Sequence, residues 1–151
     1  MKFLILVIAL VFGNPTSVPD SKLTPGVRDP HVTQKNVQQT ICVSGYTKTV
    51  RNVSVATKKK VFALYGADWA QHADYEVDHL IPLELGGSND VKNLWPEKYA
   101  TTGIGAREKD VVENDLHRRV CAGEITLRRA QDIMTKNTWL QEYAKIRGAG
   151  N

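Results

Sequence analysis

The sequence predicts an α+β fold in which a small β-hairpin packs on helices, with additional helices on its N- and C-terminal sides. Three observations support this prediction. Apolar residues favour a strand over 76–85, and Gly86-Gly87 ends it with a reversal. An apolar segment restarts over 93–95 and supplies the returning strand. A helical pattern then runs from about Ala106 to Cys121 and stops before Gly123.

Shorter elements are expected around this centre. Residues 32–41 contain few large apolar side chains and favour a short helix. Loose alternation over 42–53 favours one or two strands. An amphipathic helix is expected over 56–65, and a last helix begins near Thr126.

The start of the chain is typical of an export signal. Met1-Lys2 forms a short positive region, and an unbroken apolar run follows from Phe3 to Phe12. This run is shorter than the roughly 20 residues that span a bilayer, although a short membrane anchor is the alternative. We therefore expect a signal peptide over 1–19, a linker over 20–30 and one domain over 31–147. The mature protein would be secreted or periplasmic, without stable membrane insertion.

The two cysteines, Cys42 and Cys121, are an even pair in a chain expected to reach an oxidising compartment. A disulfide between them is the expectation, and two buried free thiols are the alternative. Two cysteines so far apart in the sequence argue against a tetrahedral cysteine zinc site.

Positive and negative side chains are concentrated in separate segments of the chain, which the net charge alone does not show. The net charge is +4, and subtracting Lys2 with the signal leaves +3. Residues 31–66 carry six basic and no acidic side chains, whereas residues 67–91 carry six acidic side chains and no Lys or Arg. This division suits a protein that contacts a polyanion with one surface and a cation with another. The run Lys58-Lys59-Lys60 is equally typical of a solvated helix start.

Chemically active residue types gather on the predicted hairpin and on the helix that follows it. Asp78 and His79 are adjacent on a strand, so their side chains should leave opposite faces unless a bulge redirects one. On the helix, Asp110, Asn114 and His117 share one face. Oxygen and imidazole ligands on that face are expected to complete a metal site with Asp78. A polar, solvated helix face is the alternative.

The spacing of these residues resembles the HNH endonuclease motif of the ββα-metal nucleases. Asn93 follows His79 by fourteen residues, with Gly-Gly-Ser-Asn-Asp between them. A wider frame, from roughly residue 30 to 140, is similar to small, often exported bacterial HNH-type proteins. One departure is the absence of the Cys-x-x-Cys pairs that many HNH domains use for a structural zinc.

The resemblance implies a role for each residue of the motif. His79 would be the general base, with an unperturbed pKa near 6.5 that suits the task. Asp78 would hold one divalent metal, and Asn93 would fix the loop after the first strand. The helix would add Asn114, His117 or both, and the sequence does not choose between them. Mg²⁺ is the default for oxygen ligands, whereas ligation by His117 would favour Mn²⁺, Ni²⁺ or Zn²⁺.

The expected function is that of a secreted, metal-dependent endonuclease that hydrolyses nucleic-acid phosphodiester bonds. The expected partner is a nucleic acid, DNA in the first place, with RNA and either strandedness left open. Five basic residues are expected to contact it: Lys58, Lys59, Lys60, Arg107 and Lys109. The alternative is a secreted, non-catalytic nucleic-acid-binding module on the same scaffold. A Ca²⁺-binding structural protein is disfavoured because a regular Asp-x-Asp-x-Asp-Gly loop is absent.

Overall fold

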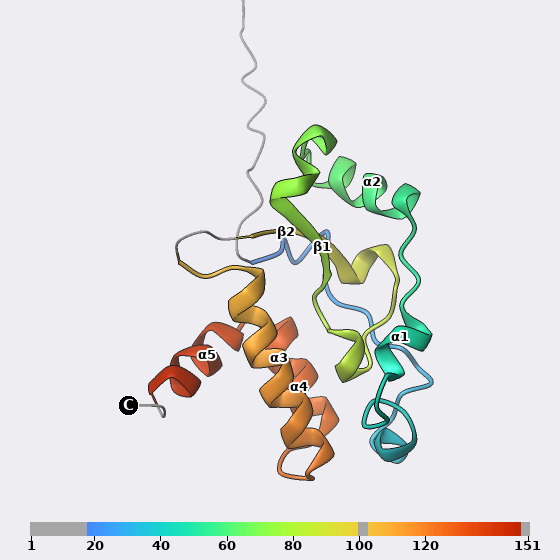
Figure 1. Cartoon of the computed structure of the whole chain (residues 1–151), viewed down its shortest axis with the longest axis vertical. Helices are drawn as coiled ribbons and strands as arrows, with labels where there is room; N and C mark the ends of the chain where they lie inside the picture. Colours follow the sequence, from blue (N-terminus) through green and yellow to red (C-terminus); the bar gives the residue numbers. More distant parts are fainter. Residues whose placement is uncertain (1–17, 100–102, 149–151) are drawn as a thin grey trace, which may run out of the picture.

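The computed structural model describes residues 18–99 and 103–148, and within them an antiparallel β-hairpin packs against helices. The expected α+β class is therefore confirmed at this level. The α-helices and strands are α1 (Tyr46–Val50), α2 (Val55–Leu64), β1 (Tyr75–His79), β2 (Leu94–Lys98), α3 (Ala106–Cys121), α4 (Leu127–Thr135) and α5 (Trp139–Gly148). In Figure 1 the helices α3, α4 and α5 gather on one side of the hairpin, and α2 lies at its other end.

The first strand is shorter than the sequence suggests. The strand predicted over 76–85 ends at His79, and the 3-10 turn η3 (Leu83–Leu85) follows after Pro82. The apolar run is explained by burial rather than by strand pairing, because Leu80, Ile81, Leu83 and Leu85 all lie in the core.

The predictions of the longer helices agree with the structure to within about one residue. Ser54 caps α2 and Thr126 caps α4, each accepting a hydrogen bond from a backbone N–H three residues on. The helix predicted over 106–121 has those bounds as α3. The strands predicted over 42–53 are wrong, since this segment contains the helix α1.

The core lies mainly between the last three helices and the loop after β1. Helix α3 contributes Val112, Leu116 and Val120, and these pack with side chains of α4 and with the fully buried Trp139 of α5. Because this apolar face of α3 is fixed against α4 and α5, its polar face is directed toward the hairpin and α1.

The segment expected to be a linker belongs to the folded body. The Thr24 hydroxyl is buried and donates to the Leu94 carbonyl oxygen at 3.0 Å. Further on, Arg28 Nε donates to Gln131 Oε1 at 2.7 Å. These contacts correct the linker boundary, and the body begins ahead of residue 31. The expected signal peptide falls largely on residues 1–17, which lie outside the described residues.

The expected disulfide is confirmed. Cys42 and Cys121 are bonded with their Cα atoms 5.7 Å apart, which ties the segment before α1 to the end of α3. Among the described residues, none of the helices has the length and apolar character needed to cross a membrane.

Candidate active site

A cleft of about 170 Å³ lies where the end of β1 meets α3 and the C-terminal end of α1. It is lined by side chains from parts of the sequence that are far apart: Thr47, Arg51, Asp78, His79, Pro82, Leu83, Glu84, Asp110, Glu113 and Asn114. The structure thus brings together Asp78, His79 and Asn114, which the sequence singled out. We call this space the acidic cleft.

The hairpin fixes the position of Asp78 and His79 through the loop that joins its strands. Asp78 pairs with Trp95 and His79 pairs with Leu94 across the two strands. The side chain of Asn93, which is fully buried, accepts from the Ile81 N–H at 3.0 Å and donates to the Ile81 carbonyl at 2.9 Å. It also donates to the Ser88 carbonyl at 2.8 Å. Asn93 therefore holds the loop, as predicted, and its amide is fully used in doing so.

The imidazole of His79 is held in one orientation by Asn89. His79 is 1% exposed, and its Nε2 lies 3.1 Å from Oδ1 of Asn89. The Asn89 amide nitrogen donates to the Val50 carbonyl at 2.8 Å, so its Oδ1 is the acceptor that faces the ring. Nε2 then carries the proton, and Nδ1 keeps a lone pair. Burial lowers the pKa of His79 despite the opposing effects of Asn89 and Asp78, which keeps the ring neutral.

Asp78 shares its two oxygens between the backbone and a buried lysine. Its Oδ1 accepts from the His79 N–H at 2.7 Å, and its Oδ2 accepts from Lys109 Nζ at 2.5 Å. Lys109 is fully buried and also binds Glu113 and, at 3.0 Å, the carbonyl oxygen of His79. Burial alone would raise the pKa of Asp78, but Lys109 and a hydrogen bond from Glu97 outweigh it and lower that pKa.

More carboxyl groups than cations surround Lys109. Burial raises the pKa of Glu113 to about 8, against the opposing charge of Lys109. Burial likewise raises the pKa of Glu97 to about 10, with Asp78 adding to the effect. Among the described residues, no group donates a hydrogen bond to the fully buried Glu97 carboxyl. This is consistent with a protonated Glu97 that itself donates to Asp78. The site therefore has three carboxyl groups, those of Asp78, Glu97 and Glu113, for the single ammonium group of Lys109.

Helix α3 places Asn114 in the acidic cleft and His117 outside it. The Asn114 amide nitrogen donates to the Asp110 carbonyl at 2.8 Å, which leaves the amide oxygen for a ligand. His117 lies about one helical turn after Asn114 on α3. Its Nε2 is 2.8 Å from the Ile41 carbonyl oxygen. His117 is absent from the cleft lining, so only Asn114 of the two candidates joins Asp78 there.

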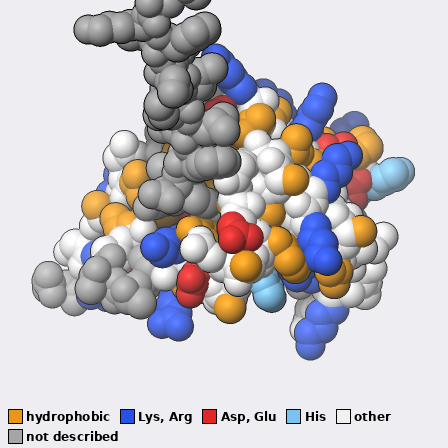
Figure 2. Space-filling model, turned by 90° about the horizontal axis from the view of Figure 1, so that it is seen from above, with side chains coloured by type: hydrophobic (Ala, Val, Ile, Leu, Met, Phe, Trp, Pro, Cys, Tyr) orange, Lys and Arg blue, Asp and Glu red, His pale blue; other side chains and the backbone are white. Residues whose placement is uncertain are grey.

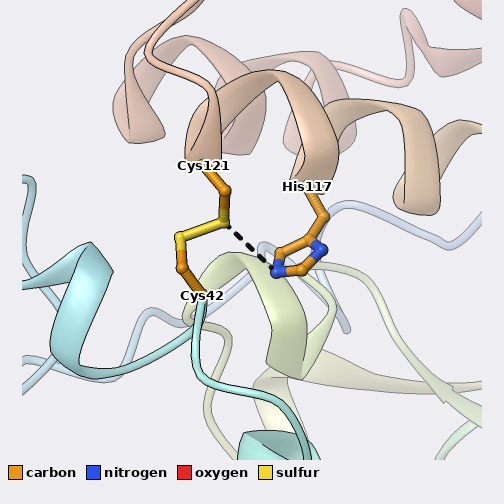
Figure 3. A group of neighbouring side chains, drawn as sticks. All are labelled: Cys42, His117 and Cys121. Atoms are coloured by element: carbon orange, nitrogen blue, oxygen red, sulfur yellow. Dashed lines mark hydrogen bonds between the residues drawn. A yellow bond between two sulfur atoms is a disulfide. The ribbon is translucent and has the colours of Figure 1, made fainter.

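His117 instead belongs to the surroundings of the disulfide. Its Nε2 is 3.5 Å from Sγ of Cys121, and Figure 3 shows the ring turned toward the disulfide. The potential ligand atoms of His117, Cys42 and Cys121 lie within 4.8 Å of one another. Because both sulfurs are in the disulfide, neither is a thiolate, and the group is not a metal site in this state.

The predicted basic contacts separate into a surface set and a buried residue. Lys59 and Lys60 are exposed on α2, Lys58 is half-buried there, and Arg107 is exposed on α3. Figure 2 shows Lys and Arg side chains set among hydrophobic ones on the face seen from above. Lys109 differs, because its burial among carboxylates leaves no ammonium hydrogen facing a phosphate on the surface. Its predicted role as a nucleic-acid contact is therefore corrected to that of an internal counterion.

Several residues of the site were not singled out from the sequence. Asn89 sits in a Gly-Gly-Ser-Asn-Asp turn, where Asn is common for backbone reasons and carries no signal of its own. Arg51 was one basic residue among six in its segment. Glu97 lies on β2 diagonal to Asp78, a relationship that becomes visible only with the strand register Asp78↔Trp95.

No family model matches the chain, and comparisons with curated proteins and with solved structures likewise find no match. The fold and the cleft define an α+β protein whose hairpin and third helix present an imidazole, several carboxyl groups and an amide to one space. An interpretation of its function rests on this geometry.

Proposed function

We propose that the chain is an exported, metal-dependent endonuclease that hydrolyses phosphodiester bonds of nucleic acid. One observation carries the proposal. A neutral His79 with an available Nδ1 lines the same cleft as Asp78, Asn114 and Arg51. These groups are a general base, two oxygen donors for a cation and a guanidinium for a phosphate.

The arrangement of elements supports the same proposal. Two antiparallel strands deliver Asp78 and His79, and the helix that follows them, α3, delivers Asn114. This is the order and use of elements expected of a ββα-metal nuclease. The disulfide between Cys42 and Cys121 is compatible with the proposed secreted or periplasmic location, because disulfides persist in oxidising compartments.

The residues of the acidic cleft fit a divalent cation that prefers oxygen. Asp78, Asp110 and Glu113 supply carboxyl oxygens, and Asn114 supplies an amide oxygen. Burial, together with the charge of Asp78, raises the pKa of Asp110, which shows a further carboxyl group without sufficient positive charge near it. We propose Mg²⁺ as the natural ion. Bound there, it would supply positive charge to a phosphoryl oxygen and to the leaving 3′-oxygen.

The remaining chemistry falls to this chain's own side chains. His79 Nδ1 takes a proton from the attacking water, and burial keeps the ring neutral so that it can do so at neutral pH. Asn89 holds Nε2 and thereby aims Nδ1. Arg51, which is exposed at the cleft, binds the phosphate beside the scissile bond.

Plasmid nicking tests the proposal directly. The chain from residue 18 onward is incubated with supercoiled DNA in EDTA, Mg²⁺, Mn²⁺, Ni²⁺ or Zn²⁺, beside the variants His79→Ala and His31→Ala. His31 is exposed and away from the cleft, so His31→Ala is the matched control. We expect metal-dependent nicking that EDTA abolishes and that His79→Ala slows by about 10²- to 10⁴-fold. Equal nicking by His79→Ala and His31→Ala would exclude His79 as the base.

One observation favours a second candidate, a non-catalytic nucleic-acid-binding module. The ammonium group of Lys109 lies between Asp78 and Glu113, and it neutralises oxygens that a cation would otherwise use. Such a module needs the exposed lysines of α2 but not the base His79. Retained DNA binding with no cleavage of DNA or RNA in any of the four metals would select this candidate.

A further inference from the structure

A second hollow lies beside the acidic cleft and is lined mainly by aromatic side chains. It has a volume of about 260 Å³, slightly below the range of roughly 300–1,000 Å³ for small-molecule sites. Its walls include Lys58, Phe62, Trp69, His72, Tyr75 and Tyr99. We call it the aromatic pocket. The proposed chemistry of the acidic cleft uses none of these six residues.

The aromatic rings form an ordered wall rather than a loose group. Trp69 and His72 are stacked, with ring centroids 4.5 Å apart and planes at 8°. The edge-on ring of Phe62, 5.1 Å from Trp69, supports this pair from beneath the surface. His72 is exposed and Trp69 is half-buried, so the stack reaches solvent. A flat, aromatic ligand would find a preformed surface there.

Cations lie beside this wall, together with one carboxyl group, that of Glu76. Lys59 Nζ lies 5.7 Å from the centroid of the Trp69 ring, and Lys58 lines the pocket. Arg51 lines both the aromatic pocket and the acidic cleft. A ligand that combines a flat ring with a neighbouring anion therefore matches the pocket, because ring and anion each meet a suitable partner.

The strand β1 connects the two spaces. Tyr75, Glu76 and Val77 line the aromatic pocket, whereas Asp78 and His79 line the acidic cleft. Successive residues of a strand advance by about 3.3 Å, so the two spaces lie roughly 10 Å apart along the strand. One extended nucleic-acid strand can reach both.

We infer that the aromatic pocket binds one unstacked nucleobase of the strand whose neighbouring phosphate lies at Arg51. This inference rests on the proposed function and adds to it a substrate class: nucleic acid that is single-stranded, or locally opened, next to the scissile phosphate. The base stacks on the Trp69–His72 wall, and Arg51 and Lys58 bind the flanking phosphates. Stacking of this kind accepts every base, so it implies no strong sequence preference.

Tryptophan fluorescence tests the inference without any cleavage. Trp95 and Trp139 are both 0% exposed, so Trp69 is the tryptophan that a bound base can reach. The probes are a fluorescently labelled single-stranded thymidine 15-mer and a matching abasic phosphodiester strand, both titrated in EDTA. We expect the thymidine strand to quench the tryptophan emission and to bind more tightly than the abasic strand. Equal affinity for the two strands, with no quenching, would overturn the inference even without a variant.

Two substitutions of Trp69 test whether its ring stacks on the base. Trp69→Phe keeps a flat ring and should bind the thymidine strand, measured by anisotropy, nearly as well as the parent. Trp69→Ala should lose about 5- to 150-fold, the range for removing an aromatic partner from one stacked base. Equal affinities of the Phe and Ala variants, with both folded by circular dichroism, would overturn the inference.

The same binding data separate this inference from the proposed function. Base-dependent quenching in EDTA together with no nicking in any metal would support the aromatic pocket and count against the nuclease. Metal-dependent nicking with identical binding of the thymidine and abasic strands would support the nuclease and overturn the aromatic pocket.

Discussion

The imidazole of His79 and the amide of Asn89 lie within hydrogen-bonding distance, with Nε2 and Oδ1 3.1 Å apart. Asn89 is itself anchored, because its amide nitrogen donates to the Val50 carbonyl and its oxygen also accepts from the Asn52 N–H at 3.3 Å. The loop between β1 and β2 and the segment after α1 therefore meet at this amide. The relationship fixes which nitrogen of His79 is free to take a proton.

Substitution of Asn89 should move the pH dependence of cleavage in a direction set by the new side chain. Burial lowers the pKa of His79, and the hydrogen bond that its Nε2 donates to Asn89 Oδ1 opposes this lowering. A general base works when unprotonated, so activity rises as pH increases through its pKa. Asn89→Ala should shift that rise to lower pH and slow cleavage by roughly 2- to 10-fold, the value of one hydrogen bond. Asn89→Asp should shift the rise to higher pH, because a carboxylate stabilises the imidazolium.

The control for this pair is Asn52→Ala, which keeps the backbone N–H that contacts Asn89. Rates of plasmid nicking are measured from pH 5 to 9 for the three variants. Shifts of Asn89→Ala and Asn89→Asp in the same direction would contradict the assigned contact.

Asn93 should matter for stability more than a turn asparagine does. Its side chain satisfies the buried N–H and C=O of Ile81 and the half-buried C=O of Ser88. Removing it leaves buried backbone groups without partners, each at a cost of about 1–3 kcal/mol. Asn93→Ala should therefore lower the free energy of unfolding by at least about 2 kcal/mol in urea titrations. Asn36→Ala is the control, since it loses two hydrogen bonds to backbone at the surface and should cost far less.

The sequence predicts the parts of the site that are local in the chain. Asp78, His79 and Asn93 occur within sixteen residues, and the helix 106–121 shows its polar face through its period. Partners that are distant in the sequence leave no such pattern. Asn89 reaches Val50, 39 residues away, and this contact depends on how the hairpin packs on the segment after α1.

The position of Lys109 could not be predicted for a different reason. A lysine beside a polar helix face is usually exposed, because burial of an unpaired charge is costly. The sequence shows the charge of Lys109 but not that Asp78 and Glu113 enclose it. The strand predicted over 76–85 was too long for a related reason. Apolar residues after His79 are buried in a turn and not in a ladder, and composition alone does not distinguish the two.

Glu97 should make stability depend on pH. Its pKa is about 10 in the folded protein, against an ordinary value of 4.5. Between these values the folded state keeps a proton that the unfolded state loses, so the stability that Glu97 contributes is greatest below about pH 4.5 and falls as pH rises toward 10. Glu97→Gln should make this fall shallower by up to about 1.4 kcal/mol per pH unit. Asp78, whose pKa is lowered, acts with the opposite sign and only at acid pH.

The measurement is urea unfolding in EDTA at pH 6 to 9. Glu124→Gln serves as the control, because Glu124 is paired with Arg118 at the surface and its lowered pKa lies outside this range. An unchanged slope in Glu97→Gln would mean that Glu97 is ionised in the fold.

Lys109→Met should destabilise the protein in a way that a divalent ion partly reverses. It removes the cation that binds both Asp78 and Glu113 and leaves the ionised Asp78 carboxylate without its partner. Breaking a buried ion pair in this way costs about 3–5 kcal/mol. If the acidic cleft holds Mg²⁺, adding the ion should raise the melting temperature of Lys109→Met more than that of the parent. Lys136→Met, which breaks an exposed pair with Asp132, should show neither effect, and a Mg²⁺ response equal to the parent's would count against the cleft as the cation site.

The lysines of α2 should determine how DNA binding depends on salt. Lys58 lines the aromatic pocket, Lys59 lies over Trp69, and Lys60 is exposed beside them. For every phosphate of duplex DNA that a variant no longer neutralises, the slope of log affinity against log salt should flatten by about 0.9. Replacing all three with Ala is compared, in EDTA and at 50 to 200 mM salt, with replacing Arg128, Lys136 and Lys145 of the α4–α5 side. Both triple variants lose the same charge, so a change confined to the α2 variant would assign the phosphate binding to that surface. Equal slopes in the two variants would mean that the α2 lysines face solvent and do not contact phosphates.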